Sequence, residues 1–216
     1  MKPDFWDDAR RTLSRGDPVM RRIIKGCGPA HLVSRSDPFQ TLARSIVGQQ
    51  ISVKAAQAVW GRVAIAAREV TPERIGRMRA TTLRGCGLSE RKVEYLKDLA
   101  SRFRGGQVDP GSWQALDDES VIGELVRVRG IGRWTAEMFL IFNLLRPDVF
   151  PVDDIGLLRA IALNYAGEAA LKDQNAASGS RYAKAAAAAI GERWRPWRSV
   201  ATWYLWRSLD PLPVEY

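Results

Sequence analysis

The residue types best suited to chemistry gather in one stretch of the sequence, residues 125–154. Near its start, a Gly-Ile-Gly tripeptide at 130–132 precedes a long apolar run. Glycine tolerates positive φ and lets another backbone come close, and a helix that begins directly after the turn directs its free N–H groups toward it. With Arg129 and Arg133 beside it, this turn is typical of a phosphate-binding site, although the same tripeptide often only reverses a chain.

Two adjacent carboxylates, Asp153 and Asp154, end the stretch in the sequence Pro-Val-Asp-Asp. A fixed carboxylate stabilises positive charge that develops in a transition state, and it can orient or deprotonate a water molecule. The simpler interpretation is that one of the two caps a helix beginning near Ile155. Spacing alone favours the cap, and the two roles are compatible in one side chain.

The elements that must position these groups are predicted to be helices. Three of them begin with a capping side chain followed by proline at the first helical position, and a fourth begins with a capping serine. Apolar residues on all sides predict a buried helix from Trp134 to Leu145. No stretch alternates convincingly between apolar and polar residues, so the sequence predicts an all-α fold. The four capping residues are Asp17, Asp37, Thr71 and Ser89.

Several connections are also predicted from residue type. Glycines at 105–111 indicate a surface connection, 166–180 is loop-like with room for a short helix, and the alanine-rich run 183–191 is typical of a scaffold helix. A Gly-Cys-Gly tripeptide at 85–87 repeats the theme of the first turn. It is either a second phosphate contact or a plain turn between helices, and the plain turn is favoured.

Composition narrows the class of protein. The 216 residues suffice for one or two domains, and a hydrophobic content of 46% excludes a disordered chain. A net charge of +9 favours a polyanionic partner, with nucleic acid first and an anionic membrane second. Two cysteines, Cys27 and Cys86, form neither a metal-binding spacing nor a disulfide framework, which fits a reducing compartment. With no signal region and no apolar run long enough to span a membrane, we expect a cytoplasmic protein.

Motifs spread over most of residues 38–207 resemble one family, in that family's order. GIGRWTA is followed, twenty positions after Trp134, by Asp154 in PVDD. Further matches are PFQTLARSIVGQQISVKAA (38–56), RGCGLSERKVEYLKDLA (84–100) and ERWRPWRSVATWYLW (192–206). Together they resemble the helix-hairpin-helix DNA glycosylase superfamily and, within it, the alkylation-repair branch, DNA-3-methyladenine glycosylase II.

The resemblance implies two α-helical lobes with a helix-hairpin-helix motif and a cleft between them. We expect one lobe from approximately 1–50 and 165–216, and the other from approximately 51–164. Some alkylation-repair relatives carry an additional N-terminal β-rich domain. Only 37 residues precede Pro38, so we expect the compact form.

The resemblance also assigns the reaction to Asp154. Cleavage of an N-glycosidic bond builds positive charge on the sugar, and a carboxylate beneath C1′ stabilises that transition state. Bifunctional members of the superfamily place a lysine where this chain has Trp134, so we expect hydrolysis without a lyase step. Trp134, Met138 and Trp206 match positions that line the base pocket in the family. Indoles suit cationic alkylated purines, whereas Met138 replaces an aromatic residue of one branch and leaves the substrate range open.

DNA contacts follow from the same resemblance. Gln49, Gln50 and Ile51 occupy the position of the wedge that fills the gap left by a flipped nucleotide, although glutamines in a loop also serve as ordinary caps. The hairpin residues Gly130, Gly132 and Arg133 are expected to hold a DNA phosphate. The backbone carbonyls of Val126, Val128 and Ile131 are expected to bind a monovalent cation, Na⁺ or K⁺.

The sequence therefore predicts a monofunctional DNA N-glycosylase that releases alkylated purines, such as 3-methyladenine and 7-methylguanine, in base-excision repair. A glycosylase of the same fold for deaminated or etheno bases is the enzymatic alternative, and a non-catalytic DNA-binding module is the alternative from another class. We expect a monomer that acts on double-stranded DNA in the cytoplasm, associated with the nucleoid in a bacterium. No iron–sulfur cluster and no further cofactor are expected.

Overall fold

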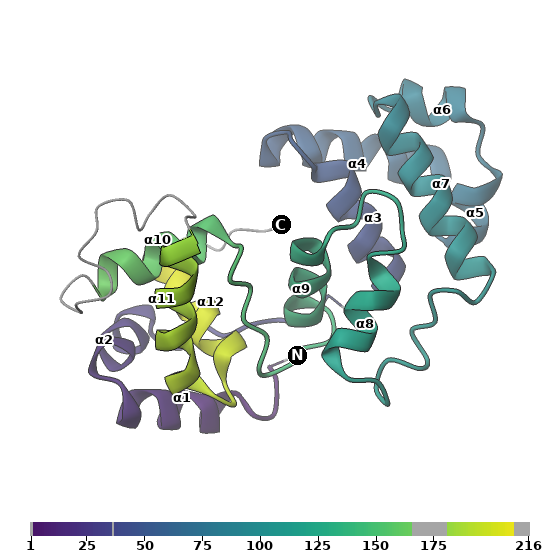
Figure 1. Cartoon of the computed structure of the whole chain (residues 1–216). Helices are drawn as coiled ribbons and strands as arrows, with labels where there is room; N and C mark the ends of the chain where they lie inside the picture. Colours follow the sequence, from purple (N-terminus) through teal and green to yellow (C-terminus); the bar gives the residue numbers. More distant parts are fainter. Residues whose placement is uncertain (1, 36, 166–180, 210–216) are drawn as a thin grey trace. The chain divides into compact units, whose positions relative to one another are not determined.

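A computed structural model describes residues 2–35, 37–165 and 181–209, and within these ranges the chain is helical and contains no strand (Figure 1). The prediction of an all-α fold is thus confirmed for the described residues. In these same ranges, none of the helices combines the length and apolar character needed to cross a membrane. The helices are α1 (Trp6–Gly16), α2 (Pro18–Cys27), α3 (Pro38–Gly48), α4 (Val53–Ala67), α5 (Pro72–Arg77), α6 (Ala80–Gly85), α7 (Glu90–Arg104), α8 (Asp118–Leu125), α9 (Arg133–Phe142), α10 (Ile155–Asn164), α11 (Arg181–Gly191), the 3-10 helix η3 (Glu192–Trp194) and α12 (Arg198–Leu209).

The described chain forms two compact units. Unit 1 contains the residues up to Ser34 and those from Leu140 onward, and unit 2 contains those from Arg35 to Phe139. The predicted lobe boundaries, near residues 50 and 164, therefore differ from the observed ones. The reason lies in packing: α3 contacts α4 and α7, which places it in unit 2, and α10 contacts α11 and α12, which places it in unit 1.

Unit 1 is built around a buried carboxylate, that of Asp17, which is 5% exposed. Its Oδ1 accepts hydrogen bonds from the backbone N–H groups of Val19 and Met20, at 2.8 and 3.1 Å, and so caps α2. Its Oδ2 accepts from the Tyr165 hydroxyl at 2.8 Å and from the Trp194 indole N–H at 3.1 Å. One side chain thereby ties the start of α2 to the end of α10 and to η3.

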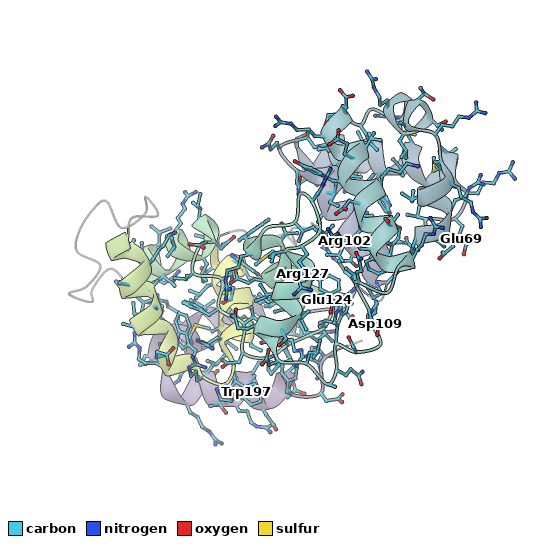
Figure 2. The ribbon with its side chains drawn as sticks, turned by 45° about the vertical axis from the view of Figure 1, so that its right-hand side comes forward. Glu69, Arg102, Asp109, Glu124, Arg127 and Trp197 are labelled. Atoms are coloured by element: carbon cyan, nitrogen blue, oxygen red, sulfur yellow. The ribbon has the colours of Figure 1, made fainter. Side chains whose placement is uncertain are left out.

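Unit 2 is organised on α7, which packs against both α3 and α5. The long connection from α7 to α8 is held by Glu124 of α8, whose Oε1 accepts from the backbone N–H of Asp109 and from the Trp113 indole N–H, at 2.8 and 2.9 Å. Glu124 and Asp109 are labelled in Figure 2. Trp113 is buried and meets the ring of Phe139 edge to face. The 105–111 segment, predicted as a surface connection, is largely exposed.

All four predicted caps are confirmed, since Asp17, Asp37, Thr71 and Ser89 each accept a hydrogen bond from a backbone N–H of the first helical turn. The alanine-rich run falls in α11, as predicted. The helix predicted from Trp134 to Leu145 begins at Arg133 and ends earlier, at Phe142. Leu145 has a positive φ of 55° and cannot continue a right-handed helix. The predicted loop at 166–180 lies outside the described residues.

Candidate active site

Asp154 is buried at the start of α10, with 9% of its surface exposed. The preceding turn is closed by its own backbone N–H, which donates to the Pro151 carbonyl at 2.9 Å. Its Oδ1 accepts from the backbone N–H of Leu157 at 2.6 Å, so Asp154 is the N-cap of α10. The predicted cap is therefore present, and it leaves the carboxylate at a helix end where N–H groups and the helix dipole favour negative charge.

A second donor reaches the same oxygen from α12. The indole Nε1–H of Trp206 donates to Asp154 Oδ1 at 2.8 Å, and the Trp206 ring stacks on Phe142 with centroids 5.8 Å apart and planes 14° apart. Gly156 leaves room for this arrangement, because a Cβ there would lie 3.2 Å from Asp154 Oδ1 and 3.5 Å from Trp206 Cδ1. Two donors from different helices thus fix the orientation of one carboxylate.

The neighbouring carboxylate has different surroundings. Asp153 is exposed and forms an ion pair with Lys184 of α11. An exposed pair of this kind contributes little to stability, about 0–1 kcal/mol. The two adjacent aspartates are therefore distinguished by burial and by hydrogen-bond donors, and only Asp154 is held in one orientation by two N–H groups.

The predicted hairpin connects α8 to α9. Its turn is closed by backbone hydrogen bonds from Val128 N–H to the Leu125 carbonyl and from Ile131 N–H to the Val128 carbonyl, at 3.0 and 3.1 Å. Of the two glycines, only Gly130 has a positive φ, 82°. A Cβ at this position would lie 2.2 Å from Cδ2 of Tyr95, so the ring of Tyr95 on α7 packs directly against the glycine backbone.

Gly130→Ala is expected to destabilise the protein by about 1–3 kcal/mol, because the added methyl group meets both an unfavourable φ and the Tyr95 ring. Gly132→Ala is the matched control, since no described heavy atom outside Gly132 and its two chain neighbours lies within 4 Å of a Cβ there. Urea unfolding of the two variants measures the difference. Equal stabilities would contradict the close packing of Tyr95 on the hairpin.

Arg133, predicted to meet a DNA phosphate, is engaged by two carboxylates. Its guanidinium forms a two-point contact with Glu119 of α8, including an Nη1–Oε2 distance of 2.9 Å, and its Nε donates to Glu137 Oε1 at 3.0 Å. The hydrogen bonds with Glu119 raise the pKa of Arg133 above its usual range. In this structure the side chain therefore ties α8 to α9, and a phosphate would have to compete with Glu119.

Trp134 and Met138 lie one turn apart on α9, so their side chains share one face of that helix. Trp134 is 41% exposed and Met138 is half-buried. The prediction of a helix buried on most sides is confirmed beyond the first two residues of α9, because only the residues at 133 and 134 are exposed. The residues at 136, 137, 139, 140 and 141 are buried.

The predicted wedge residues follow α3 directly. Gln50 is exposed and has a positive φ of 58°, which is strained for a residue other than glycine, and Ile51 is 40% exposed. Gln49 behaves differently: it is half-buried, and its side-chain Nε2 donates to the carbonyl of Gly130 at 2.7 Å. The structure therefore brings Gln49 together with the hairpin and leaves Gln50 and Ile51 at the surface.

The three carbonyls predicted to bind a cation lie at the end of α8 and in the turn. Val126 follows the last residue of α8 and is exposed, whereas Val128 and Ile131 have buried side chains. Carbonyls at a helix C-terminus have no partner within the helix, and hard cations take oxygen ligands of this kind. The Val128 carbonyl also accepts the Ile131 N–H, which occupies one of its two lone pairs.

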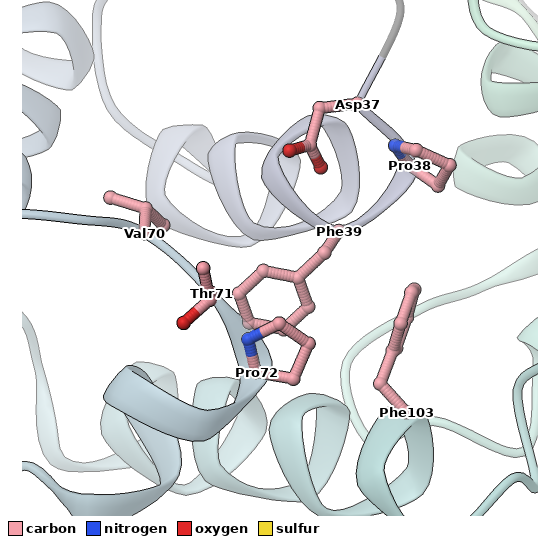
Figure 3. Close-up of a pocket in the computed structure, with 7 residues that line it drawn as sticks. All are labelled: Asp37, Pro38, Phe39, Val70, Thr71, Pro72 and Phe103. Atoms are coloured by element: carbon pink, nitrogen blue, oxygen red, sulfur yellow. The ribbon is translucent and has the colours of Figure 1, made fainter.

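Unit 2 also carries a hollow of about 420 Å³ where α3 and α5 begin (Figure 3). Within it, the rings of Phe39 and Phe103 pack edge to face, with their centroids 5.2 Å apart. None of the residues predicted for catalysis, base contact, DNA contact or cation binding lines this hollow, so we do not assign it to the candidate site. The lining residues are Asp37, Pro38, Phe39, Val70, Thr71, Pro72 and Phe103.

Sequence reasoning missed three residues that position the candidate groups: Gly156, Lys92 and Tyr95. Gly156 makes space beside Asp154, and a glycine in the first turn of a predicted helix is the signal that indicates it. Lys92 and Tyr95 lie on α7, within the stretch 84–100 that carries part of the family resemblance. Their contacts depend on which segments pack against α7.

Comparisons with known proteins give a consistent result. Residues 43–179 match the family described as HhH-GPD superfamily base excision DNA repair protein. The chain is 32% identical to DNA-3-methyladenine glycosylase 1 of Schizosaccharomyces pombe, over 91% of this chain and 84% of that protein. Its structure is similar to that of a DNA-3-methyladenine glycosidase from Bacillus halodurans, with a TM-score of 0.80, 33% identity, and coverage of 94% of this chain and 89% of the other. It is also similar to a Schizosaccharomyces pombe 3-methyladenine DNA glycosylase in complex with abasic DNA, with a TM-score of 0.78, 30% identity, and coverage of 97% and 99%.

Proposed function

The chain belongs to the HhH-GPD superfamily of base excision DNA repair proteins, and from this premise we propose that it is a DNA glycosylase for alkylated purines. It hydrolyses the N-glycosidic bond between deoxyribose and bases of the 3-methyladenine and 7-methylguanine type. The observation that carries this function is the buried carboxylate of Asp154, oriented by two N–H donors from α10 and α12. The names of the relatives support the choice of substrate.

The chemistry follows from the charge that develops during the reaction. As the C1′–N bond breaks, its electron pair leaves with the base and the sugar becomes positively charged. A carboxylate held in place stabilises that charge without reorganising, so it favours the transition state over the ground state. Water then forms the new bond to C1′ and loses a proton, for which Asp154 is the proposed acceptor. The products are a free base and an abasic site.

An alkylated purine needs no proton from the enzyme. N-alkylation gives the base a positive charge, and the base becomes neutral when it takes the electron pair of the broken bond. This explains how one carboxylate suffices for the reaction. An indole attracts such a cation through its π face. The base contacts proposed from the family resemblance are Trp134, Met138 and Trp206.

We propose that the enzyme is monofunctional. A lyase step requires an amine that forms a Schiff base with the sugar, and the family position for that amine holds Trp134. The sequence of α9, RWTAEMFLIF, contains no lysine. Hydrolysis therefore ends at the intact abasic strand.

The proposed partner is double-stranded DNA, bound by a monomer in the cytoplasm. The net charge of +9 favours that partner. Gly130, Gly132 and Arg133 of the hairpin face a phosphate in this proposal, while Gln50 and Ile51 enter the duplex. The carbonyls of Val126, Val128 and Ile131 are oxygen donors suited to a Na⁺ or K⁺ ion beside that phosphate.

Base release from methylated duplex DNA tests the proposed function. The wild-type protein is expected to liberate 3-methyladenine and 7-methylguanine and to leave strands that break only after treatment with alkali. Direct strand cleavage would contradict the monofunctional assignment. Binding without release would favour a non-catalytic DNA-binding module, and release of only deaminated or etheno bases would favour the same fold with another lesion.

A further inference from the structure

The loop that follows α3 and the hairpin between α8 and α9 are joined by one side chain. Gln49, the C-cap residue of α3, donates through Nε2 to the carbonyl of Gly130 at 2.7 Å. These residues are 81 positions apart in the sequence, and both belong to unit 2. Because Gln49 is half-buried, a hydrogen bond of this length restricts both segments more than a solvated surface contact does.

Lys92 of α7 holds the backbone of the same loop. Its Nζ donates to the carbonyls of Val47 and Gln49 at 2.8 and 2.7 Å. These carbonyls lie at the C-terminal end of α3, where acceptors have no partner within the helix and a positive charge is favoured. Burial lowers the pKa of the Lys92 ammonium. The loop is therefore anchored through its backbone by Lys92 and through its side chain by Gln49.

The hairpin is anchored on the same helix. Tyr95, three positions after Lys92 and so on the same face of α7, packs against Gly130. Asp98, three positions further, accepts the backbone N–H of Arg129 through Oδ2 at 2.9 Å. Helix α7 thus contacts both the loop and the hairpin, and the hydrogen bond from Gln49 to Gly130 joins the loop directly to the hairpin.

We infer that Gln49 is a positioning residue rather than part of the wedge that enters the duplex. Together with Lys92 it forms a brace that holds the exposed Gln50 and Ile51 in a fixed place relative to the phosphate-binding hairpin. This role presupposes the proposed function, since it matters only when the hairpin grips DNA and the wedge enters it. The strained backbone of Gln50, with φ at 58°, is consistent with a residue that its anchored neighbours hold in place.

The brace keeps Gln50 and Ile51 at a fixed position relative to the hairpin. A hairpin fixed on a phosphate then sets where Gln50 and Ile51 meet the duplex, so flipping depends on the brace whereas gripping of undamaged DNA does not. Phosphate contacts supply most of the sequence-independent affinity for DNA. Loss of the brace is therefore expected to impair nucleotide flipping without weakening the binding of undamaged DNA. Misplacement of a positioning group by about 1 Å can slow a reaction by about 10²-fold.

Gln49→Met tests the brace, because methionine keeps the length of the side chain and cannot donate to the Gly130 carbonyl. Gln57→Met is the matched control: Gln57 is an exposed glutamine of α4 whose side chain makes no hydrogen bond in the described part of the chain. Flipping is followed by the fluorescence of 2-aminopurine placed beside the lesion, and base release by single-turnover kinetics at saturating DNA. Gln49→Met is expected to slow both by about 10-fold or more. Its affinity for undamaged duplex and its unfolding midpoint are expected to stay close to those of the control.

Lys92→Met provides a second, independent variant, because it releases the same loop from α7. It is expected to show the same flipping defect, and the double variant is expected to lose less than the product of the two single effects, since both residues anchor one loop. Flipping by Gln49→Met at the wild-type rate would overturn the brace, as would equal losses of flipping and of duplex affinity. Fluorescence needs no chemistry, so a wild type that unstacks DNA without releasing a base would contradict the proposed function and not the brace.

Discussion

Asp154→Asn is expected to slow the release of alkylated bases by about 10²-fold or more while DNA binding and stability are retained. Asparagine is as good an N-cap as aspartate, and its side-chain oxygen can still accept from Leu157 N–H and from the Trp206 indole. The substitution therefore removes the negative charge and keeps the shape and both hydrogen bonds. Single-turnover release of 3-methyladenine from methylated duplex measures the effect.

The adjacent aspartate supplies the control for that variant. Asp153→Asn removes a charge of the same sign one residue away, from an exposed side chain paired with Lys184. The rate of base release is expected to change by less than about 2-fold, since an exposed ion pair contributes little to the stability of the fold. An Asp154→Asn enzyme with the activity of Asp153→Asn would mean that Asp154 is only the cap of α10 and that the reaction is carried by another group.

The local features of the fold were predictable because residue type alone determines them. A capping side chain followed by proline specifies where a helix begins, and Asp17, Asp37 and Thr71 each do so. A cap at Asp153 or Asp154 was also predicted, and the structure shows that it is Asp154. These signals act within one helical turn, and no knowledge of packing is needed to use them.

The contacts that orient the candidate site were not predictable, because they join residues that are far apart in the sequence. Trp206 is 52 positions from Asp154, and Gln49 is 81 positions from Gly130. The sequence indicated Trp206 and Gln49 as contacts to base and to DNA, but a bond to Asp154 or to Gly130 depends on how helices pack. The predicted lobe boundaries differ from the boundaries of the two units for the same reason. The cap of α3 is local, whereas its assignment to unit 2 comes from contacts with α4 and α7.

Asp17→Asn is expected to lower the free energy of unfolding by about 2–4 kcal/mol, the largest stability effect anticipated from a polar substitution in unit 1. The asparagine oxygen can keep the two backbone bonds from Val19 and Met20. Its NH₂ group then faces the Trp194 indole N–H and the Tyr165 hydroxyl, so at least the indole loses its acceptor inside the core. Urea unfolding at about pH 7 measures the loss.

A matched control separates the buried carboxylate from the cap itself. Asp37 also precedes a proline and caps a helix, with its Oδ1 accepting the backbone N–H of Gln40 at 2.8 Å, but its side chain is exposed. Asp37→Asn is expected to change stability by less than about 0.5 kcal/mol, because asparagine caps a helix as well as aspartate does. Equal effects at the two positions would show that the bonds to Tyr165 and Trp194 contribute nothing.

The dependence on pH provides an independent test of the Asp17 network. Burial by itself raises the pKa of this carboxyl, but hydrogen bonds from Trp194, Tyr165, Met20 and Val19 outweigh it, so the pKa in the folded protein lies below the ordinary value. A carboxyl with a lowered folded pKa stabilises the protein above the pKa of the unfolded chain, about 3.9, and loses that contribution as pH falls through the folded pKa. The stability difference between wild type and Asp17→Asn is therefore expected to be constant from about pH 7 to 5 and to shrink below about pH 4. A difference that stays constant down to about pH 2 would mean that the lost stability comes from packing and not from the ionised carboxylate.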